Sequence, residues 1–221
     1  RGVERADRAV GRLVDGLKST DRYDDALIVF LADHGEGFRE RDLWYDHGTS
    51  AHVEQTHVPL IIKYPKNRLA GSVDGRLVSL IDVAPTVLDV ASLSPLKQAD
   101  GRSLASKAPV RTLSISESSH CKRVAVLDCS PVGGRGKELA VRSLTHTLVS
   151  RSEQSGESER LYDRGTDAEE LSPIDRDGAL SHDAVMHVLR ADRRMRTYDP
   201  LPGVEADDQE NRNLRALGYV E

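Results

Sequence analysis

The chain has 221 residues, of which 38% are hydrophobic, 30% are charged and only 4% are aromatic, so one globular core, with or without a small subdomain, must be built mainly from aliphatic side chains. A net charge of -5, with no cluster of Lys and Arg interleaved with aromatic residues, argues against a nucleic-acid partner. No apolar run approaches the roughly 20 residues that span a bilayer, and two cysteines, Cys121 and Cys129, exclude a four-cysteine zinc module but leave their own pairing open.

The first half of the chain predicts a helix, a strand, a long polar loop, a second strand and a second helix. Residues 3–17 carry apolar side chains at steps of three and four, which is the period of an amphipathic helix. The runs 26–31 and 58–62 are apolar without alternation, as in strands of a parallel sheet that is covered on both faces. Asp82 is placed to cap the second helix, with Pro85 in its first turn. This order predicts an α/β fold with a mostly parallel sheet core and flanking helices.

The pattern changes near residue 110, after which short alternating segments predict a small antiparallel sheet. The segments are 112–116, 123–127, 139–143 and 147–150, with residues 153–159 expected to form a solvated turn. A further helix is expected from Ser181 to about Met195. We therefore expect residues 1–110 to belong to the α/β core and residues 111–221 to form a small α+β subdomain and tail.

An acidic residue and a histidine stand side by side where the first predicted strand ends. Asp33 offers a hard oxygen, and His34 an imidazole nitrogen, to a divalent cation. Open α/β sheets bind ligands beyond the carboxyl ends of their strands, which is where this pair falls. The plain alternative is a strand that ends in polar residues, and an isolated Asp-His-Gly favours that alternative.

Seven segments, in order along the chain, resemble the sulfatase family of the alkaline phosphatase superfamily. They are residues 28–36, 46–50, 57–62, 80–89, 100–104, 161–163 and 214–219. The resemblance implies metal-assisted hydrolysis of sulfate esters, with residues 1–110 as the C-terminal part of the catalytic core. It assigns Asp33 and His34 to one divalent metal, usually Ca²⁺, and His47 to contact with the sulfate or the leaving oxygen. It also implies a periplasmic or extracellular location.

The nucleophile of that family has no counterpart in this sequence. Sulfatases use a Cys or Ser that is converted to formylglycine in a Cys-x-Pro-Ser-Arg type segment. Residues 129–133 begin like that motif, but Val132 and Gly133 stand where Ser and Arg are needed, and the segment lies downstream of the Asp-His pair. Since the chain also begins with Arg1, we expect it to be the C-terminal portion of a sulfatase, inactive alone, with formylglycine on a missing N-terminal part.

Two alternative functions stay open. The first is a phosphodiesterase, phosphonate hydrolase or phosphoethanolamine transferase of the same superfamily, which would use Zn²⁺ or Mn²⁺ and a Thr, Ser or Cys nucleophile. The second is a truncated chain that binds without catalysis. The substrate and the oligomeric state are left open.

The other histidines are interpreted as structural. His52 and His57 lie close in sequence to His34 and His47, but the three spacings between these four histidines match no compact zinc module, so hydrogen-bonded structural roles are expected for both. Asp46, directly before His47, would either hold that histidine protonated or face solvent.

Overall fold

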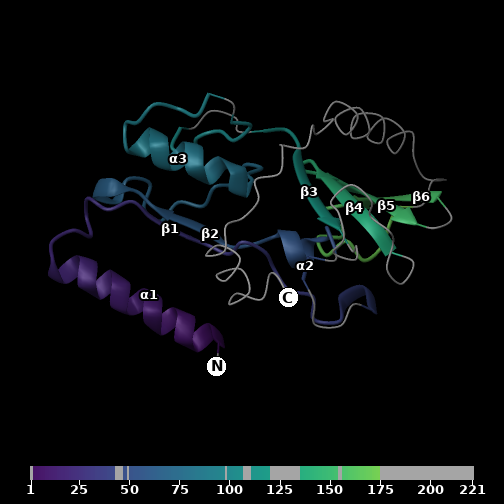
Figure 1. Ribbon diagram of the computed structural model, residues 1–221, viewed down its shortest axis with the longest axis horizontal. Coiled ribbons are helices and arrows are strands. Elements are labelled where there is room, and N and C mark those ends of the chain that lie inside the picture. Colours follow the sequence, from purple (N-terminus) through teal and green to yellow (C-terminus); the bar gives the residue numbers. More distant parts are fainter. Residues whose placement is uncertain are drawn as a thin grey trace, which may run out of the picture. The chain divides into compact units, whose positions relative to one another are not determined.

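The computed structural model describes residues 2–42, 47–48, 50–97, 99–106, 111–119, 135–153 and 156–174. The chain divides into two units, Arg1–Leu189 and Arg190–Glu221, and every described residue belongs to the first. The helices and strands (Figure 1) are α1 (Gly2–Ser19), β1 (Ile28–Leu31), α2 (Val53–Thr56), β2 (Leu60–Lys63), α3 (Val83–Val90), β3 (Ser114–Ser119), β4 (Arg135–Arg142), β5 (His146–Glu153) and β6 (Gly156–Asp163). Three 3-10 turns are η1 (Glu40–Asp42), η2 (Pro65–Asn67) and η3 (Leu80–Asp82).

The two predicted apolar strands are antiparallel neighbours. β1 pairs with β2 in a register that places Val29 opposite Ile62, and a mostly parallel core is therefore not confirmed. An unalternating apolar run predicts burial on both faces of a strand but carries no information about strand direction. The predicted burial is also incomplete, because Phe30 and Ile61 are exposed. Parallel neighbours need a crossover connection that carries the chain back to the start of the first strand. Here the loop instead places the start of β2 beside the end of β1, with Leu60 opposite Leu31.

The two helices predicted in the first half are present. α1 covers the predicted amphipathic segment, with Glu4 in its first turn and Lys18 in its last, which complements the helix dipole. No residue of α1 is buried. α3 begins directly after Asp82 and accommodates Pro85 in its first turn, as predicted.

Asp82 occupies the N-cap position of α3 without capping that helix with its side chain. Its fully buried carboxylate instead accepts the backbone N–H groups of Ser79 at 2.8 Å and Arg102 at 2.9 Å, and it forms an ion pair with Arg111. The prediction that the Asp82 side chain caps α3 is therefore wrong, because the carboxylate binds Ser79, Arg102 and Arg111 instead. The carboxylate ties η3 to the segment around residues 102 and 111, because a buried charge is stable only when it is paired and hydrogen-bonded.

A four-stranded antiparallel sheet in the order β3-β4-β5-β6 forms the second part of the fold (Figure 1). One face carries a core of Val141, Leu148 and Leu161. The other face carries Ala140, Val149 and Tyr162, which cluster with Ala51 from the loop between β1 and β2. The sheet therefore packs directly against the polar loop that contains the candidate site.

The predicted antiparallel sheet is confirmed in kind but not in its extent. β6 starts at Gly156 and pairs with β5 along its length, so the solvated turn expected over residues 153–159 is wrong. Its polar residues lack an apolar alternation, and the hydrogen-bonded ladder of the hairpin holds them in a strand.

Several predictions fall outside the described residues. They are the segment 123–127, the helix at 181–195, the residues Asp46, Cys121 and Cys129, and the closing segment 214–219. The domain boundary near residue 110 stays a prediction. Among the described helices, none has the length and hydropathy of a membrane span.

Candidate metal and catalytic site

Asp33 and His34 follow β1 immediately, at the start of the loop toward β2. The Asp33 carboxylate accepts the backbone N–H of His34 at 3.0 Å. His34 Nδ1 lies 2.8 Å from the carbonyl oxygen of Gly35. A carbonyl oxygen can only accept, so Nδ1 carries the proton of the neutral ring and Nε2 keeps its lone pair.

These two side chains are suited to sharing one cation. His34 Nε2 and Asp33 Oδ1 are 3.9 Å apart, a span that two bonds of about 2.0–2.2 Å to a single ion can bridge. Two donors do not complete a coordination shell. No group of three or more His, Cys, Asp or Glu side chains able to hold a metal occurs within the described part of the chain. The described residues thus provide part of a metal site.

His47 lies beside this pair. Its ring stacks on the ring of His34 with centroids 4.5 Å apart and an interplanar angle of 17°. Its Nδ1 is 3.3 Å from a carboxylate oxygen of Glu36. The structure therefore brings together all three side chains that the sequence singled out, and it adds Glu36, which stands only two positions after His34 and was not singled out.

Gly35 joins this turn to α2. Its backbone N–H donates to the carbonyl oxygen of Gln55 at 2.8 Å. A Cβ atom at this position would lie 2.1 Å from the carbonyl oxygen of Glu54, far inside any permitted contact. Only glycine allows α2 to pack this closely against the Asp33–His34 turn.

His52 and His57 take different places at the two ends of α2. His52 is 2% exposed, and its Nδ1 lies 2.7 Å from a carboxylate oxygen of Glu170. Its ring also meets Tyr162 edge-on, with centroids 5.5 Å apart. His57 is exposed, and its backbone N–H closes α2 on Val53. The buried, hydrogen-bonded His52 agrees with the structural role expected for it.

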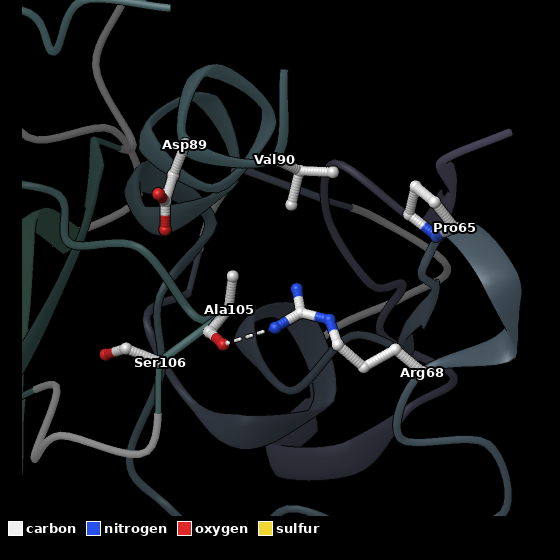
Figure 2. A pocket seen from close by; sticks show the side chains of 6 residues that line it. All are labelled: Pro65, Arg68, Asp89, Val90, Ala105 and Ser106. Atoms are coloured by element: carbon white, nitrogen blue, oxygen red, sulfur yellow. Dashed lines mark hydrogen bonds between the residues drawn. The ribbon is translucent and has the colours of Figure 1, made fainter. Parts of the chain in front are cut away.

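A pocket of about 470 Å³ lies elsewhere in the described part of the chain. It is lined by Pro65, Arg68, Asp89, Val90, Ala105 and Ser106. Figure 2 shows the guanidinium group of Arg68 reaching across it to the carbonyl oxygen of Ala105, at 3.3 Å. None of its lining residues belongs to the loop between β1 and β2, so the pocket is separate from the candidate site.

The comparison with known families covers the part of the chain that contains Asp33, His34 and His47. Residues 1–93 match the family model described as Sulfatase. This segment belongs to the sulfatase family. Over 103 residues the chain is 36% identical to the multifunctional alkaline phosphatase superfamily protein PehA of Trinickia caryophylli, which covers 46% of this chain and 20% of that protein. It is also 35% identical over 98 residues to arylsulfatase K of Gallus gallus, and this match covers 44% of this chain and 18% of that protein.

Solved structures extend the sulfatase fold beyond the matched segment. A phosphonate monoester hydrolase from Silicibacter pomeroyi superposes with a TM-score of 0.67 and 28% identity, over 87% of this chain and 39% of that chain. A putative sulfatase from Bacteroides thetaiotaomicron superposes with a TM-score of 0.68 and 24% identity, over 91% and 43%. The chain thus matches about a fifth of the length of these curated relatives and about two fifths of these solved structures.

Proposed function

We propose that this chain supplies one side of a sulfuric ester hydrolase site, within a longer polypeptide that carries a formylglycine nucleophile. The observation that supports this most directly is the stack of His47 on His34, beside Asp33. It places a candidate metal pair and a candidate proton donor next to each other, as hydrolysis of a sulfate monoester requires.

Each of these side chains has a definable task in the proposed reaction. Asp33 and His34 would hold a divalent cation, which supplies charge stabilisation to the nonbridging oxygens when bound. Gly35 fixes the tautomer of His34 by accepting from its Nδ1. Glu36 accepts from Nδ1 of His47, so the imidazolium form keeps an Nε2–H that can donate to the departing alkoxide oxygen.

The identity of the cation is part of the proposal. The resemblance implies Ca²⁺, an ion that takes oxygen ligands. The imidazole nitrogen of His34 is a donor that suits Zn²⁺ better and that Mn²⁺ also accepts in mixed sites. Titration of the metal-free protein with Ca²⁺, Mn²⁺ and Zn²⁺ ranks the three directly.

A phosphoryl or phosphonyl transfer enzyme is the second candidate. It is favoured by the 28% identical structure, which is a phosphonate monoester hydrolase. Parallel assays with 4-nitrophenyl sulfate and a 4-nitrophenyl phosphonate monoester separate the two, and no turnover of either favours a chain that binds without catalysis.

The proposed site is tested in the full-length enzyme, meaning the natural polypeptide that contains this chain. Asp33→Ala should abolish activity through metal loss, because the site loses its anionic donor. His47→Ala should keep the metal and lower turnover about a hundredfold, the usual scale for one lost donor to a developing charge. Elemental analysis and steady-state rates measure both effects.

The matched control is Asp7→Ala, which removes an exposed carboxylate from α1. It should change neither metal content nor rate. Full metal occupancy and normal turnover in Asp33→Ala would remove that residue from the site, and an unchanged rate in His47→Ala would reduce that histidine to a loop residue.

A further inference from the structure

Four charged or titratable side chains are buried together where the loop between β1 and β2 meets the four-stranded sheet. They are His52, Glu138, Arg142 and Glu170, with exposures of 2%, 2%, 7% and 1%. We call them the buried charge cluster. None of them belongs to the candidate metal pair. Withdrawing such groups from water is costly, and apolar residues of similar size often give an equally stable core, so the cluster calls for an explanation other than stability.

Glu170 is at the centre of the cluster. One carboxylate oxygen faces His52 Nδ1 at 2.7 Å and Arg142 Nη2 at 3.2 Å, and the other accepts from Arg142 Nε at 3.1 Å. The arginine therefore binds the carboxylate with two nitrogens, which fixes direction as well as distance.

The remaining contacts of the cluster are hydrogen bonds to the backbone of the loop between β1 and β2. Arg142 Nη2 donates to the carbonyl oxygen of Ala51 at 2.6 Å, while the Glu138 carboxylate accepts the N–H of Ala51 at 2.8 Å. Glu138 is itself held by Arg151 at 2.6 Å. Side chains of β4 thus hold both polar backbone groups of one loop residue.

Backbone hydrogen bonds through α2 connect His52 to the turn that carries the candidate metal pair. The carbonyl oxygen of His52 accepts the N–H groups of Gln55 and Thr56, both at 3.1 Å, and so starts α2. The carbonyl oxygen of Gln55 then accepts the N–H of Gly35 at 2.8 Å. Gly35 directly follows His34, and the close approach of Glu54 leaves this turn no room to shift toward α2.

Arg41 makes a second connection between α2 and Glu170. Arg41 forms an ion pair with Glu54 at 2.6 Å and donates to the backbone carbonyl oxygen of Glu170 at 2.7 Å. The same acidic residue that anchors His52 is thus tied through its backbone to the helix that His52 begins.

We propose that the buried charge cluster positions the Asp33–His34 pair from the four-stranded sheet, with His52 and Glu170 as positioning residues that act through α2 and Gly35. The inference rests on the proposed function for the identity of the pair, but the mechanical connection is independent of the reaction. A purely structural cluster would affect only the stability of the protein, whereas a positioning cluster affects metal binding and turnover in a protein that remains folded.

The test uses four variants of the full-length enzyme. His52→Phe keeps a flat ring but removes the hydrogen bond to Glu170, and His52→Gln restores a donor of similar reach. Glu170→Gln keeps the shape of the side chain and removes its charge. Asp82→Asn is the matched control, because it also discharges a buried carboxylate that pairs with an arginine, Arg111, but at α3.

Three readouts are compared at a temperature where each variant is folded by circular dichroism. They are the dissociation constant for Mn²⁺ and Ca²⁺, the separate values of kcat and KM, and hydrogen exchange of the Gly35 amide. For His52→Phe and Glu170→Gln we expect metal binding weakened about tenfold, the lower end of the effect of supporting residues around metal sites. We also expect a lower kcat with little change in KM, and faster Gly35 exchange. His52→Gln should recover much of each loss, and Asp82→Asn should show none of them.

The proposal is overturned if His52→Phe and Glu170→Gln lose stability as Asp82→Asn does but bind metal and exchange Gly35 like the wild type. It is also overturned if both fail to fold while Asp82→Asn folds, because the cluster would then serve folding as a whole. Asp33→Ala in the same assays keeps the two ideas apart. Unchanged metal binding in that variant contradicts the proposed function, whereas Gly35 exchange still reports whether the cluster controls the turn.

Discussion

Gly35 shows at the scale of one residue how closely the candidate site is packed. The position before it carries a candidate metal ligand, and the space where its side chain would be is filled by backbone of α2. Backbone cannot rotate away as a flexible side chain can, so a substitution must move either α2 or the turn itself.

Gly35→Ala is expected to lower the free energy of unfolding by about 1–3 kcal/mol, the usual cost of overpacking, and to weaken metal binding. Gly16→Ala is the matched control, since a Cβ there meets nothing within 4 Å, and inside α1 it should raise stability by up to about 1 kcal/mol. Urea denaturation of both variants measures the difference. Equal free energies of unfolding for the two variants would mean that α2 moves to accommodate the added methyl group at little cost.

The sequence named Asp33, His34 and His47 through family resemblance, and the structure brings them together. It could not name Glu170, because this residue meets His52 across 118 positions of the chain and neither residue is part of a recognisable local pattern. Glu36, by contrast, was within reach of local reasoning. It lies 11 positions from His47, and a carboxylate beside an Asp-His pair is a signal that can be searched for.

At the scale of elements, prediction succeeded where a period was strong and failed where contacts decide the structure. α1 follows from its helical spacing, and β4 and β5 from their alternation. α2 has only four residues, too few to be stable without tertiary contacts. The direction of β1 relative to β2 was missed as well, because an apolar run has no direction until its partner is known.

The packing of β4 against the loop gives a prediction for pH. Burial raises the pKa of the Glu170 carboxyl, but the hydrogen bond from His52 and the charge of Arg142 outweigh it and lower that pKa to about 2, from 4.5. Glu138, Arg41, Glu54 and Arg164 are further charged residues near this contact. A lowered pKa contributes stability that is complete above pH 4.5 and is lost as the pH falls toward 2.

We therefore expect the free energy of unfolding to fall on the order of 3 kcal/mol more in the wild type than in Glu170→Gln between pH 4.5 and pH 2. Chemical denaturation at a series of pH values gives both curves. Parallel curves over this interval would show that Glu170 titrates normally in the folded protein.

At the scale of the whole molecule, the described apolar surface predicts how the 221-residue chain behaves alone. Val3 and Leu13 of α1 are 87% and 59% exposed, and Ile61 of β2 is 63% exposed. Among the described residues, the sheet of β1 and β2 consists of these two strands, and an isolated two-stranded sheet is at best marginally stable. Exposed apolar side chains of this kind invite association.

We expect the chain expressed alone neither to hydrolyse 4-nitrophenyl sulfate nor to behave as a well-folded monomer. Catalysis should fail because the described residues offer two candidate metal donors, and because the sequence has no Cys-x-Pro-Ser-Arg type segment to supply an activated nucleophile. Size-exclusion chromatography, a thermal melt and an assay with added Ca²⁺ measure these properties. A soluble monomer with a cooperative melt would contradict the expectation about folding, and metal-dependent turnover would contradict the expectation about catalysis.

The hydrogen bond between His52 and Glu170 also limits how related enzymes can be recombined. A chimera with a junction anywhere between α2 and β4 would take the histidine from one parent, and Arg142, Glu138 and Glu170 from the other. Where the parents differ at these positions, a charge would be buried without its partner, at a cost of about 3–5 kcal/mol. Productive junctions should therefore lie before Asp33 or after residue 170, so that the loop, with its Arg41–Glu54 ion pair, and the sheet are inherited together.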